Sequence, residues 1–272
     1  MKVRATQAIL ECLLEQEVDT VFGYPGGTIL NLYDELYHYQ DKIHHILTAH
    51  EQGASHAADG YARSTGKVGV CFATSGPGAT NLTTGIATAY MDSSPVVFIT
   101  CNVTEETLGK DAFQEVDITG IAMPITKATY LVRDPQTIPD VMRQAFAVAA
   151  TGRPGPVLID IPIDVQEQSL KKFYYPEEVS IRGYKPSVKG NDLQIKRVVE
   201  AISRSKQPLI CAGGGVWLAD AKEELLELAE RCSIPVVKTM MGLGLLPTDH
   251  PLNMGMIGAH GNHCANKALA KA

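Results

Sequence analysis

Short runs of apolar residues alternate along the first 165 residues with longer segments whose apolar positions recur every three or four residues. The short runs predict buried strands, and the longer segments predict helices. Strands are expected at 18–22, 43–48, 67–74, 95–100 and 156–161, and helices at 5–15, 29–37, 51–64, 79–90 and 139–150. Because buried strands alternate with helices, we expect an α/β fold, a parallel sheet with helices on both faces.

The pattern changes near residue 168. Residues 169–190 mix charged residues, proline and glycine, which predicts a linker after a first domain at 1–168. A second α/β pattern follows, with helices expected at 193–203 and 221–232 and strands at 207–212 and 234–239. Two strands are too few for a complete parallel sheet, so residues 191–272 are expected to form a truncated, Rossmann-like middle domain.

Composition narrows the class of protein. With 45% hydrophobic residues and a net charge of -6, the chain is expected to be globular and not to bind nucleic acid. No apolar run approaches the roughly 20 residues needed to cross a bilayer, so no membrane partner is expected. Early acidic residues argue against a secretion signal. The six cysteines contain no CxxC pair and predict buried, reduced thiols in a cytoplasmic protein.

Candidate chemistry lies after the predicted strands, where parallel sheets bind ligands. Glu51 begins an alanine-rich helix after the strand at 43–48. One interpretation is structural, because a carboxylate there complements the helix dipole by about 0.3–1 kcal/mol. The other is functional, because a carboxyl group among glycine, alanine and proline neighbours can share a proton with a ligand nitrogen.

Three further patterns are individually weak. The segment TSGPGATN at 74–81 suits close backbone approach to a ligand, but a tight strand-to-helix turn explains its glycines equally well. The glycines at 213–215 suggest a dinucleotide site without a full GxGxxG, so a plain dehydrogenase rests on them alone. His50, Glu51 and His56 have the spacing HExxxxH instead of HExxH, which makes shared zinc ligation unfavourable.

Four longer stretches together resemble one family. They are FGYPGGTILNLYDEL, HEQGASHAADGYARSTGKVGVCFATSGPGATNL, KDAFQEVDITGI and TGRPGPVLIDIPIDV. They resemble the thiamine-diphosphate enzymes, and among them the large catalytic subunits of acetolactate synthase (acetohydroxyacid synthase). The resemblance covers essentially the whole chain and is strongest over 18–165. It implies that 1–168 is a pyrimidine-binding domain and that 191–272 is an FAD-associated middle domain.

The resemblance also implies roles for individual residues. Glu51 matches the catalytic glutamate that hydrogen-bonds N1′ of the aminopyrimidine of thiamine diphosphate. Positions matching the surroundings of this cofactor are Tyr24, Pro25, Gly26, Gly27, Thr74, Pro77 and Asn81. Phe113 and Gln114 match a pair that lines the substrate site, with Gln114 also beside the cofactor. Positions matching FAD contacts are Arg153, Gly213, Gly214, Thr239, Met240, Ala259, His260 and Gly261.

The activity implied by the resemblance is decarboxylation of pyruvate and its ligation to a second 2-ketoacid, in branched-chain amino acid biosynthesis. FAD does no net redox work in that reaction. The implied assembly is a homodimer or homotetramer, and biosynthetic members also bind a small regulatory subunit. Another enzyme of the same cofactor class, such as pyruvate oxidase or sulfoacetaldehyde acetyltransferase, stays open as an alternative.

Some positions depart from the family pattern. Cys101 and Asn102 stand where members often have Gly-Gln, Thr104 where many have Pro, and Ala259 where Met is frequent. No GDG…N pattern suited to a diphosphate and Mg²⁺ site occurs, since Mg²⁺ is held by a third domain that is absent here. The chain as given is therefore expected to be inactive alone, and a non-catalytic fragment stays open as a second alternative.

Overall fold

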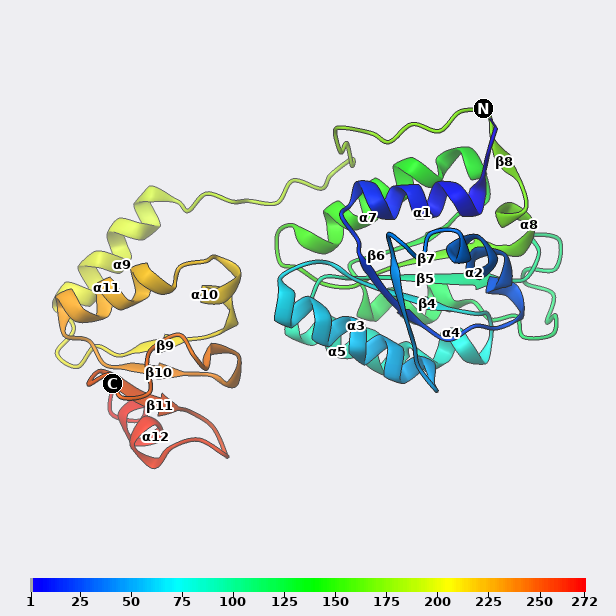
Figure 1. Ribbon diagram of the computed structural model, residues 1–272. Helices are drawn as coiled ribbons and strands as arrows, with labels where there is room; N and C mark the ends of the chain where they lie inside the picture. Colours follow the sequence, from blue (N-terminus) through cyan, green and yellow to red (C-terminus); the bar gives the residue numbers. More distant parts are fainter. Residues whose placement is uncertain (1) are drawn as a thin grey trace. The chain divides into compact units, whose positions relative to one another are not determined.

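The computed structural model describes residues 2–272, and the chain forms two compact units that divide between Val188 and Lys189 (Figure 1). The first unit is built on a six-stranded sheet in which every neighbouring pair is parallel, in the order β3-β2-β4-β5-β7-β6. Its strands are β2 (Thr20–Gly23), β3 (His44–Leu47), β4 (Gly69–Ala73), β5 (Val96–Asn102), β6 (Ala128–Leu131) and β7 (Val157–Pro162).

Helices cover both faces of this sheet, as expected from the sequence. They are α1 (Ala5–Glu15), α2 (Leu30–Tyr37), α3 (Glu51–Thr65), α4 (Pro77–Asn81), α5 (Thr83–Asp92), α6 (Ile118–Ala122), α7 (Ile138–Ala150) and α8 (Ile163–Gln166). Short 3-10 turns lie at Gly27–Ile29, Met123–Ile125 and Pro135–Thr137. In Figure 1, α1 and α7 lie on one face, and α3 and α5 lie on the other.

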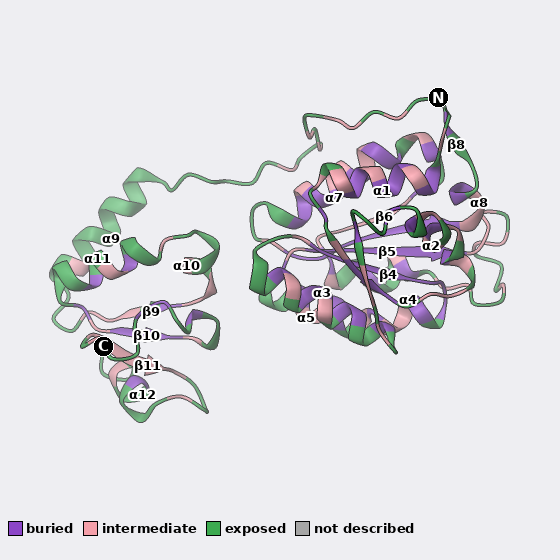
Figure 2. Ribbon diagram, viewed as in Figure 1, coloured by how far each residue is buried: buried purple, intermediate pink, exposed green. Residues whose placement is uncertain are grey.

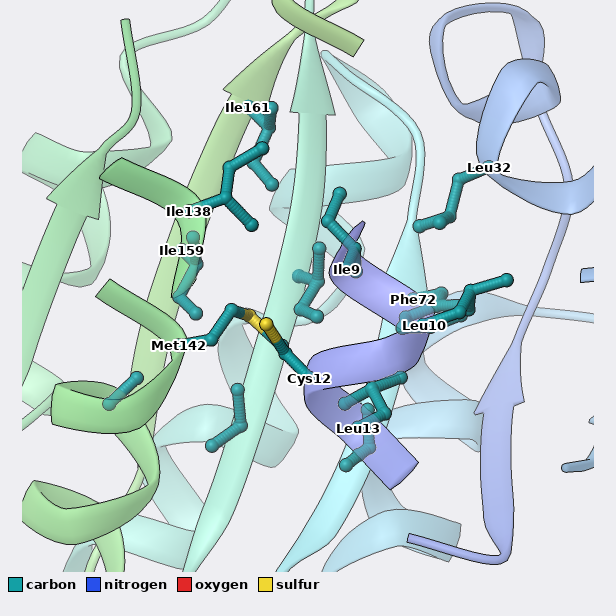
Figure 3. Packing of buried hydrophobic residues seen from close by; sticks show 14 of the residues in the cluster. Ile9, Leu10, Cys12, Leu13, Leu32, Phe72, Ile138, Met142, Ile159 and Ile161 are labelled. Atoms are coloured by element: carbon teal, nitrogen blue, oxygen red, sulfur yellow. The ribbon is translucent and has the colours of Figure 1, made fainter. Parts of the chain in front are cut away.

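The central strands are buried on both faces, as Figure 2 shows by colour. Along β4, Val70 and Phe72 belong to the apolar cluster under α1 and α7, whereas Cys71 and Ala73 belong to the cluster under α3 and α5. This alternation follows from the two-residue period of a strand. Figure 3 shows the first cluster, where α1 packs Ile9 and Leu13 against the sheet.

The first unit also contains a small antiparallel pair. Strand β1 (Val3–Arg4) pairs with β8 (Ser169–Leu170), and the backbone N–H of Ala5 donates to the carbonyl of Gln168 at 2.9 Å. The residues after β8 remain with this unit, because Phe173, Tyr175, Ile181 and Tyr184 pack against the cluster under α1 and α7. Strand β1, which precedes the six-stranded sheet in the chain, therefore pairs with β8, which follows it.

The second unit has a three-stranded parallel sheet in the order β11-β10-β9. Its strands are β9 (Ile210–Ala212), β10 (Val236–Lys238) and β11 (Asn253–Met256), and its helices are α9 (Asp192–Arg204), α10 (Gly214–Leu218), α11 (Lys222–Cys232) and α12 (His263–Leu269), with a 3-10 turn at Met240–Gly242. Its core is small, and α9 has no buried residue.

The structure corrects several sequence expectations. Strands β6 and β11 were not expected, and the helix expected at 79–90 is two helices, α4 and α5, separated at Leu82. The prediction of buried thiols is correct for Cys12, Cys71 and Cys101 but wrong for the exposed Cys211, Cys232 and Cys264. Among residues 2–272 no helix is long and apolar enough to cross a bilayer.

Candidate functional site

Glu51 lies at the carboxyl edge of the first sheet, in the first turn of α3. The cap of this helix is His50, whose ring Nδ1 accepts the backbone N–H of Gln52 at 3.1 Å. Glu51 is therefore not needed as the capping side chain. Its side chain is nearly enclosed, since the residue is only 7% exposed. A buried carboxylate that does not cap its own helix is placed to contact something other than the helix start.

Asn81 provides the hydrogen bond to this carboxylate. Its side-chain Nδ2 donates to Oε2 of Glu51 at 2.9 Å, from the last residue of α4. Among residues 2–272, Oε1 of Glu51 accepts no hydrogen bond. Two residues that are 30 positions apart in the sequence therefore form one polar group with a free acceptor.

The turn between β4 and α4 requires its glycines. Gly76 has φ +56° and ψ -119°, a conformation that side chains rarely adopt, and Pro77 then begins α4. A Cβ on Gly78 would lie 2.6 Å from Cγ2 of Thr74 and 3.2 Å from Oε1 of Glu51. Glycine at 78 thus lets the start of α4 approach both side chains. The neighbouring Ser75 hydroxyl is buried and has no hydrogen-bond partner within the described part of the chain.

The loop after β2 packs onto the same turn. A Cβ on Gly26 would lie 2.4 Å from Cγ2 of Thr74, whereas a Cβ on Gly27 would meet nothing within 4 Å. The Thr28 side chain connects the loop after β2 to the turn after β4 and to β5 through hydrogen bonds. Its hydroxyl lies 2.9 Å from the Thr74 hydroxyl, accepts the N–H of Ser75 at 3.0 Å and donates to the carbonyl of Cys101. Tyr24 is 40% exposed, and Pro25 is partly exposed beside it.

Phe113 and Gln114 reach this region from the segment after β5. Gln114 has φ +58°, and a Cβ on Gly76 would lie 2.6 Å from the Gln114 carbonyl oxygen. The two segments are therefore in direct contact. The Phe113 side chain is 87% exposed, so it lies at the rim of the region and not within it.

Arg153 lies elsewhere. It precedes β7, whereas Glu51 follows β3, so the two residues are at opposite edges of the parallel sheet. Its Nε donates to the Ser93 hydroxyl at 2.7 Å, and its Nη2 donates to the Met91 carbonyl at 3.0 Å. The structure therefore does not bring Arg153 together with the residues around Glu51.

In the second unit, the remaining predicted residues gather at the carboxyl edge of the small sheet. Gly213 and Gly214 follow β9, Thr239 and Met240 follow β10, and Ala259, His260 and Gly261 follow β11. A Cβ on Gly213 would lie 3.3 Å from Oγ1 of Thr239, and the N–H of Thr239 donates to the Ala212 carbonyl at 2.9 Å. In open α/β sheets, ligands bind outside the carboxyl ends of the strands.

Sequence reasoning missed one buried polar cluster. Asp160, in the middle of β7, is 2% exposed and accepts the Thr100 hydroxyl at 2.7 Å and the Asn102 amide at 2.8 Å. Burial raises the pKa of Asp160 to about 6, against the lowering effect of these two donors. A single acidic residue within the apolar run VLIDIP was the available signal.

The zinc interpretation is not supported. Among residues 2–272 no three His, Cys, Asp or Glu side chains are placed to hold a metal ion.

Comparisons with known proteins agree with the fold of both units. Residues 3–121 match the family described as thiamine pyrophosphate enzyme, N-terminal TPP binding domain, and residues 195–272 match its central domain. The chain is 52% identical over 271 residues to a probable acetolactate synthase large subunit of Methanocaldococcus jannaschii, covering 99% of this chain and 46% of that protein.

Other relatives give the same picture. The acetolactate synthase large subunit of Corynebacterium glutamicum is 51% identical over 271 residues, covering 100% of this chain and 43% of that protein. The acetolactate synthase of Arthrospira platensis is 51% identical over 276 residues, covering 98% of this chain and 47% of that protein. The chain thus spans about half the length of the curated relatives it matches.

Proposed function

Because this chain belongs to the thiamine pyrophosphate enzyme family, as a homologue of the amino-terminal part of acetolactate synthase large subunits, we propose that it forms the pyrimidine-binding part of an acetolactate synthase. The proposed reaction removes CO₂ from pyruvate and joins the remaining two-carbon unit to a second 2-ketoacid. The observation that carries the proposal is the buried Glu51 carboxylate, oriented by Asn81 and open at Oε1.

The residues at the carboxyl edge of the first sheet suit an aminopyrimidine ring. Oε1 of Glu51 is available to share a proton with ring nitrogen N1′, while Asn81 holds Oε2. Gly78 lets the backbone of α4 lie close to Glu51 and Thr74, and the buried Ser75 hydroxyl has no hydrogen-bond partner among residues 2–272. When bound, thiamine diphosphate supplies the thiazolium carbon that takes up the ketoacid and the electron sink for loss of CO₂.

The chain's own residues then have separate tasks. Glu51 holds and moves a proton at N1′, and Asn81 keeps the carboxylate aimed at that nitrogen. Gly26, Gly27, Tyr24, Pro25, Thr74 and Pro77 form the walls around the ring. Phe113 and Gln114 lie at the rim, where the second ketoacid is expected to approach.

We extend the proposal to FAD in the second unit. The support is the gathering of Gly213, Gly214, Thr239 and Met240 at one sheet edge, with the Ala259–Gly261 turn after the adjacent strand. FAD would have no redox task in the proposed reaction. For Arg153 the proposal of an FAD contact rests on the GRPGP motif alone, and within the first unit its guanidinium donates to the Ser93 hydroxyl and to the carbonyls of Tyr90 and Met91. Mg²⁺ is proposed to bind only through the third domain of the complete protein.

The proposed protein works as a homodimer or homotetramer in the cytoplasm, and a small regulatory subunit is a proposed partner. The buried free thiols Cys12, Cys71 and Cys101 support a reducing compartment.

The proposal is tested with the complete gene product, incubated with pyruvate, thiamine diphosphate, Mg²⁺ and FAD. We expect acetolactate as the main product. Formation of acetyl phosphate, or of free aldehyde alone, would instead assign a different reaction to the same cofactor. Glu178→Gln, which neutralises an exposed glutamate, is the matched control for Glu51→Gln in the same assay.

A further inference from the structure

The buried carboxylate of Asp160 has no cationic partner among residues 2–272. Its two donors both come from β5, where Thr100 donates to Oδ1 and Asn102 donates to Oδ2. In the register of the sheet Thr100 lies directly opposite Asp160. Burying a charge costs free energy unless it is hydrogen-bonded. The carboxylate therefore holds the side chains of its two donors, Thr100 and Asn102, in a fixed orientation.

Asn102 also hydrogen-bonds the segment that contains Val116. Its side-chain Nδ2 also donates to the carbonyl of Val116 at 3.2 Å, and its Oδ1 accepts the N–H of Val103 at 2.8 Å. The amide group thus makes three hydrogen bonds, two through Nδ2 and one through Oδ1. With one amide hydrogen held by Asp160 and Oδ1 held by Val103, the other amide hydrogen is the one available to Val116.

Val116 closes a tight loop that contains Phe113 and Gln114. Within the loop the N–H of Glu115 donates to the Ala112 carbonyl at 3.0 Å, and the N–H of Gly109 donates to Oε1 of Glu115 at 3.2 Å. Asp111 and Gln114 both have positive φ, at 53° and 58°. Such conformations cost energy in residues other than glycine, so contacts from outside the loop must maintain them.

Two outside contacts meet this need. One is the close approach of Gly76 to Gln114, and the other is the hydrogen bond from Asn102 to Val116. The first comes from the turn beside Glu51, and the second comes from the sheet. Only the second contains a side chain that can be changed without altering the turn beside Glu51.

We propose that Asn102, oriented by Asp160, is a positioning residue that fixes the Phe113–Gln114 loop at the rim of the site and so determines how the second 2-ketoacid is received. The task given to the loop rests on the proposed function. That Asn102 orders the loop does not depend on the proposed function.

Thr100 offers a matched control. Thr100→Val and Asn102→Leu each remove one hydrogen bond from the same buried carboxylate. Only Asn102→Leu also removes the bond to Val116 in the loop, together with the bond that the Val103 N–H donates to Asn102 Oδ1. Asn102→Gln keeps the amide, and its extra methylene has room because Asn102 lines a cavity of about 370 Å³. A role limited to the core would make the leucine and valine variants behave alike.

The first measurement is hydrogen–deuterium exchange of peptides that cover residues 109–117 in the complete protein. We expect exchange there to become at least about tenfold faster in Asn102→Leu, with Thr100→Val and Asn102→Gln within about twofold of the parent. Equal exchange in Asn102→Leu and the parent, or equal acceleration in Asn102→Leu and Thr100→Val, overturns the proposal. If Asn102→Leu does not fold, Asn102→Ala replaces it with the same expectations.

The second measurement is competition between pyruvate and 2-ketobutyrate as second substrate. We expect Asn102→Leu to raise KM for the second ketoacid about tenfold and to change the product ratio, with the Kd for thiamine diphosphate unchanged. An unchanged product ratio with a lowered kcat alone contradicts the substrate role. If the parent makes no acetolactate, the proposed function fails, and the exchange experiment still decides whether Asn102 orders the loop.

Discussion

The side-chain amide of Asn81 donates to Oε2 of Glu51 over 2.9 Å and joins the end of α4 to the start of α3. The two helices follow β4 and β3, which are not neighbours in the sheet because β2 lies between them. The bond therefore connects the segment after β3 with the segment after β4 at the carboxyl edge of the sheet. It leaves the carboxylate with one hydrogen-bonded oxygen, Oε2, and a second, Oε1, that lies close to Gly78 and accepts no hydrogen bond among residues 2–272.

Glu51→Gln is expected to abolish most of the activity of the complete protein. The amide keeps the shape of the side chain but is a far weaker proton acceptor, and loss of general acid–base catalysis costs about 10²–10⁴-fold in rate. Steady-state kcat measured with saturating thiamine diphosphate tests this. Glu178→Gln is expected to stay within about twofold of the parent. Activity of Glu51→Gln within a few-fold of the parent would remove Glu51 from its proposed role.

Asn81→Leu is expected to lower kcat/KM by about 10–100-fold. The variant removes a hydrogen bond to a charged group, worth about 1.5–3 kcal/mol, and each 1.36 kcal/mol corresponds to about tenfold in rate. Thr80→Val is the control, because the Thr80 hydroxyl donates to the Pro77 carbonyl of its own helix. A fall of equal size in both variants would assign the effect to the helix instead of the bond.

Gly78→Ala is expected to destabilise the first unit by about 1–3 kcal/mol and to weaken cofactor binding. The added Cβ would meet Thr74 at 2.6 Å and Glu51 at 3.2 Å, and overpacking of this kind has costs in that range. Denaturant unfolding and titration with thiamine diphosphate measure the two effects.

Gly60→Ala provides the opposite case. Gly60 lies inside α3, and a Cβ there would meet nothing within 4 Å. Alanine is favoured over glycine in a helix by about 0.5–1 kcal/mol, so this variant is expected to be more stable with unchanged cofactor affinity. Loss of cofactor affinity in Gly60→Ala but not in Gly78→Ala would contradict the placement of the ligand beside Gly78.

Asp160 is expected to make stability depend on pH. Burial raises the pKa of Asp160 from 3.8 to about 6, so between these values the folded state holds a proton that the unfolded state releases. The free energy of unfolding therefore falls as pH rises through this window, by about 3 kcal/mol in total, and then levels off.

Asp160→Asn tests this dependence, because its amide cannot ionise. Urea unfolding of both proteins at pH values from 4 to 7 should show the variant gaining stability relative to the parent as pH rises. Parallel curves for the two proteins would show that Asp160 does not titrate in this range.

The regular part of the fold follows from apolar patterning, and its exceptions have physical causes. Strands β4, β5 and β7 are apolar runs buried on both faces, so the sequence predicts them almost to the residue. Strands β6 and β11 contain only four half-buried residues each, which leaves no strong apolar signal. The break between α4 and α5 depends on local bonds, such as that of the Thr83 hydroxyl to the Thr80 carbonyl.

The sequence proposes residues for the candidate site through the family resemblance, but it does not predict the contacts between them. Glu51 and Asn81 stand out through their family resemblance, yet their hydrogen bond joins positions 30 apart and depends on the sheet order. For Asp160 the sequence predicts the strand but does not single out the residue as functional. It lies within a run that predicts a buried strand correctly, and its polar partners become visible only when β5 is placed beside β7.

The pairing of β1 with β8 has a consequence for how this architecture is reused. Val3 of β1 lies opposite Leu170 of β8, so the segments that precede and follow the six-stranded sheet in the chain are neighbours. The residues from Leu170 to Val188 then stay with the same unit. A structural unit whose two ends lie close together can be inserted into another chain without distorting that chain. This pairing makes the layer a self-contained structural unit, in which all six strands of the sheet beneath Glu51 lie between β1 and β8 in the chain.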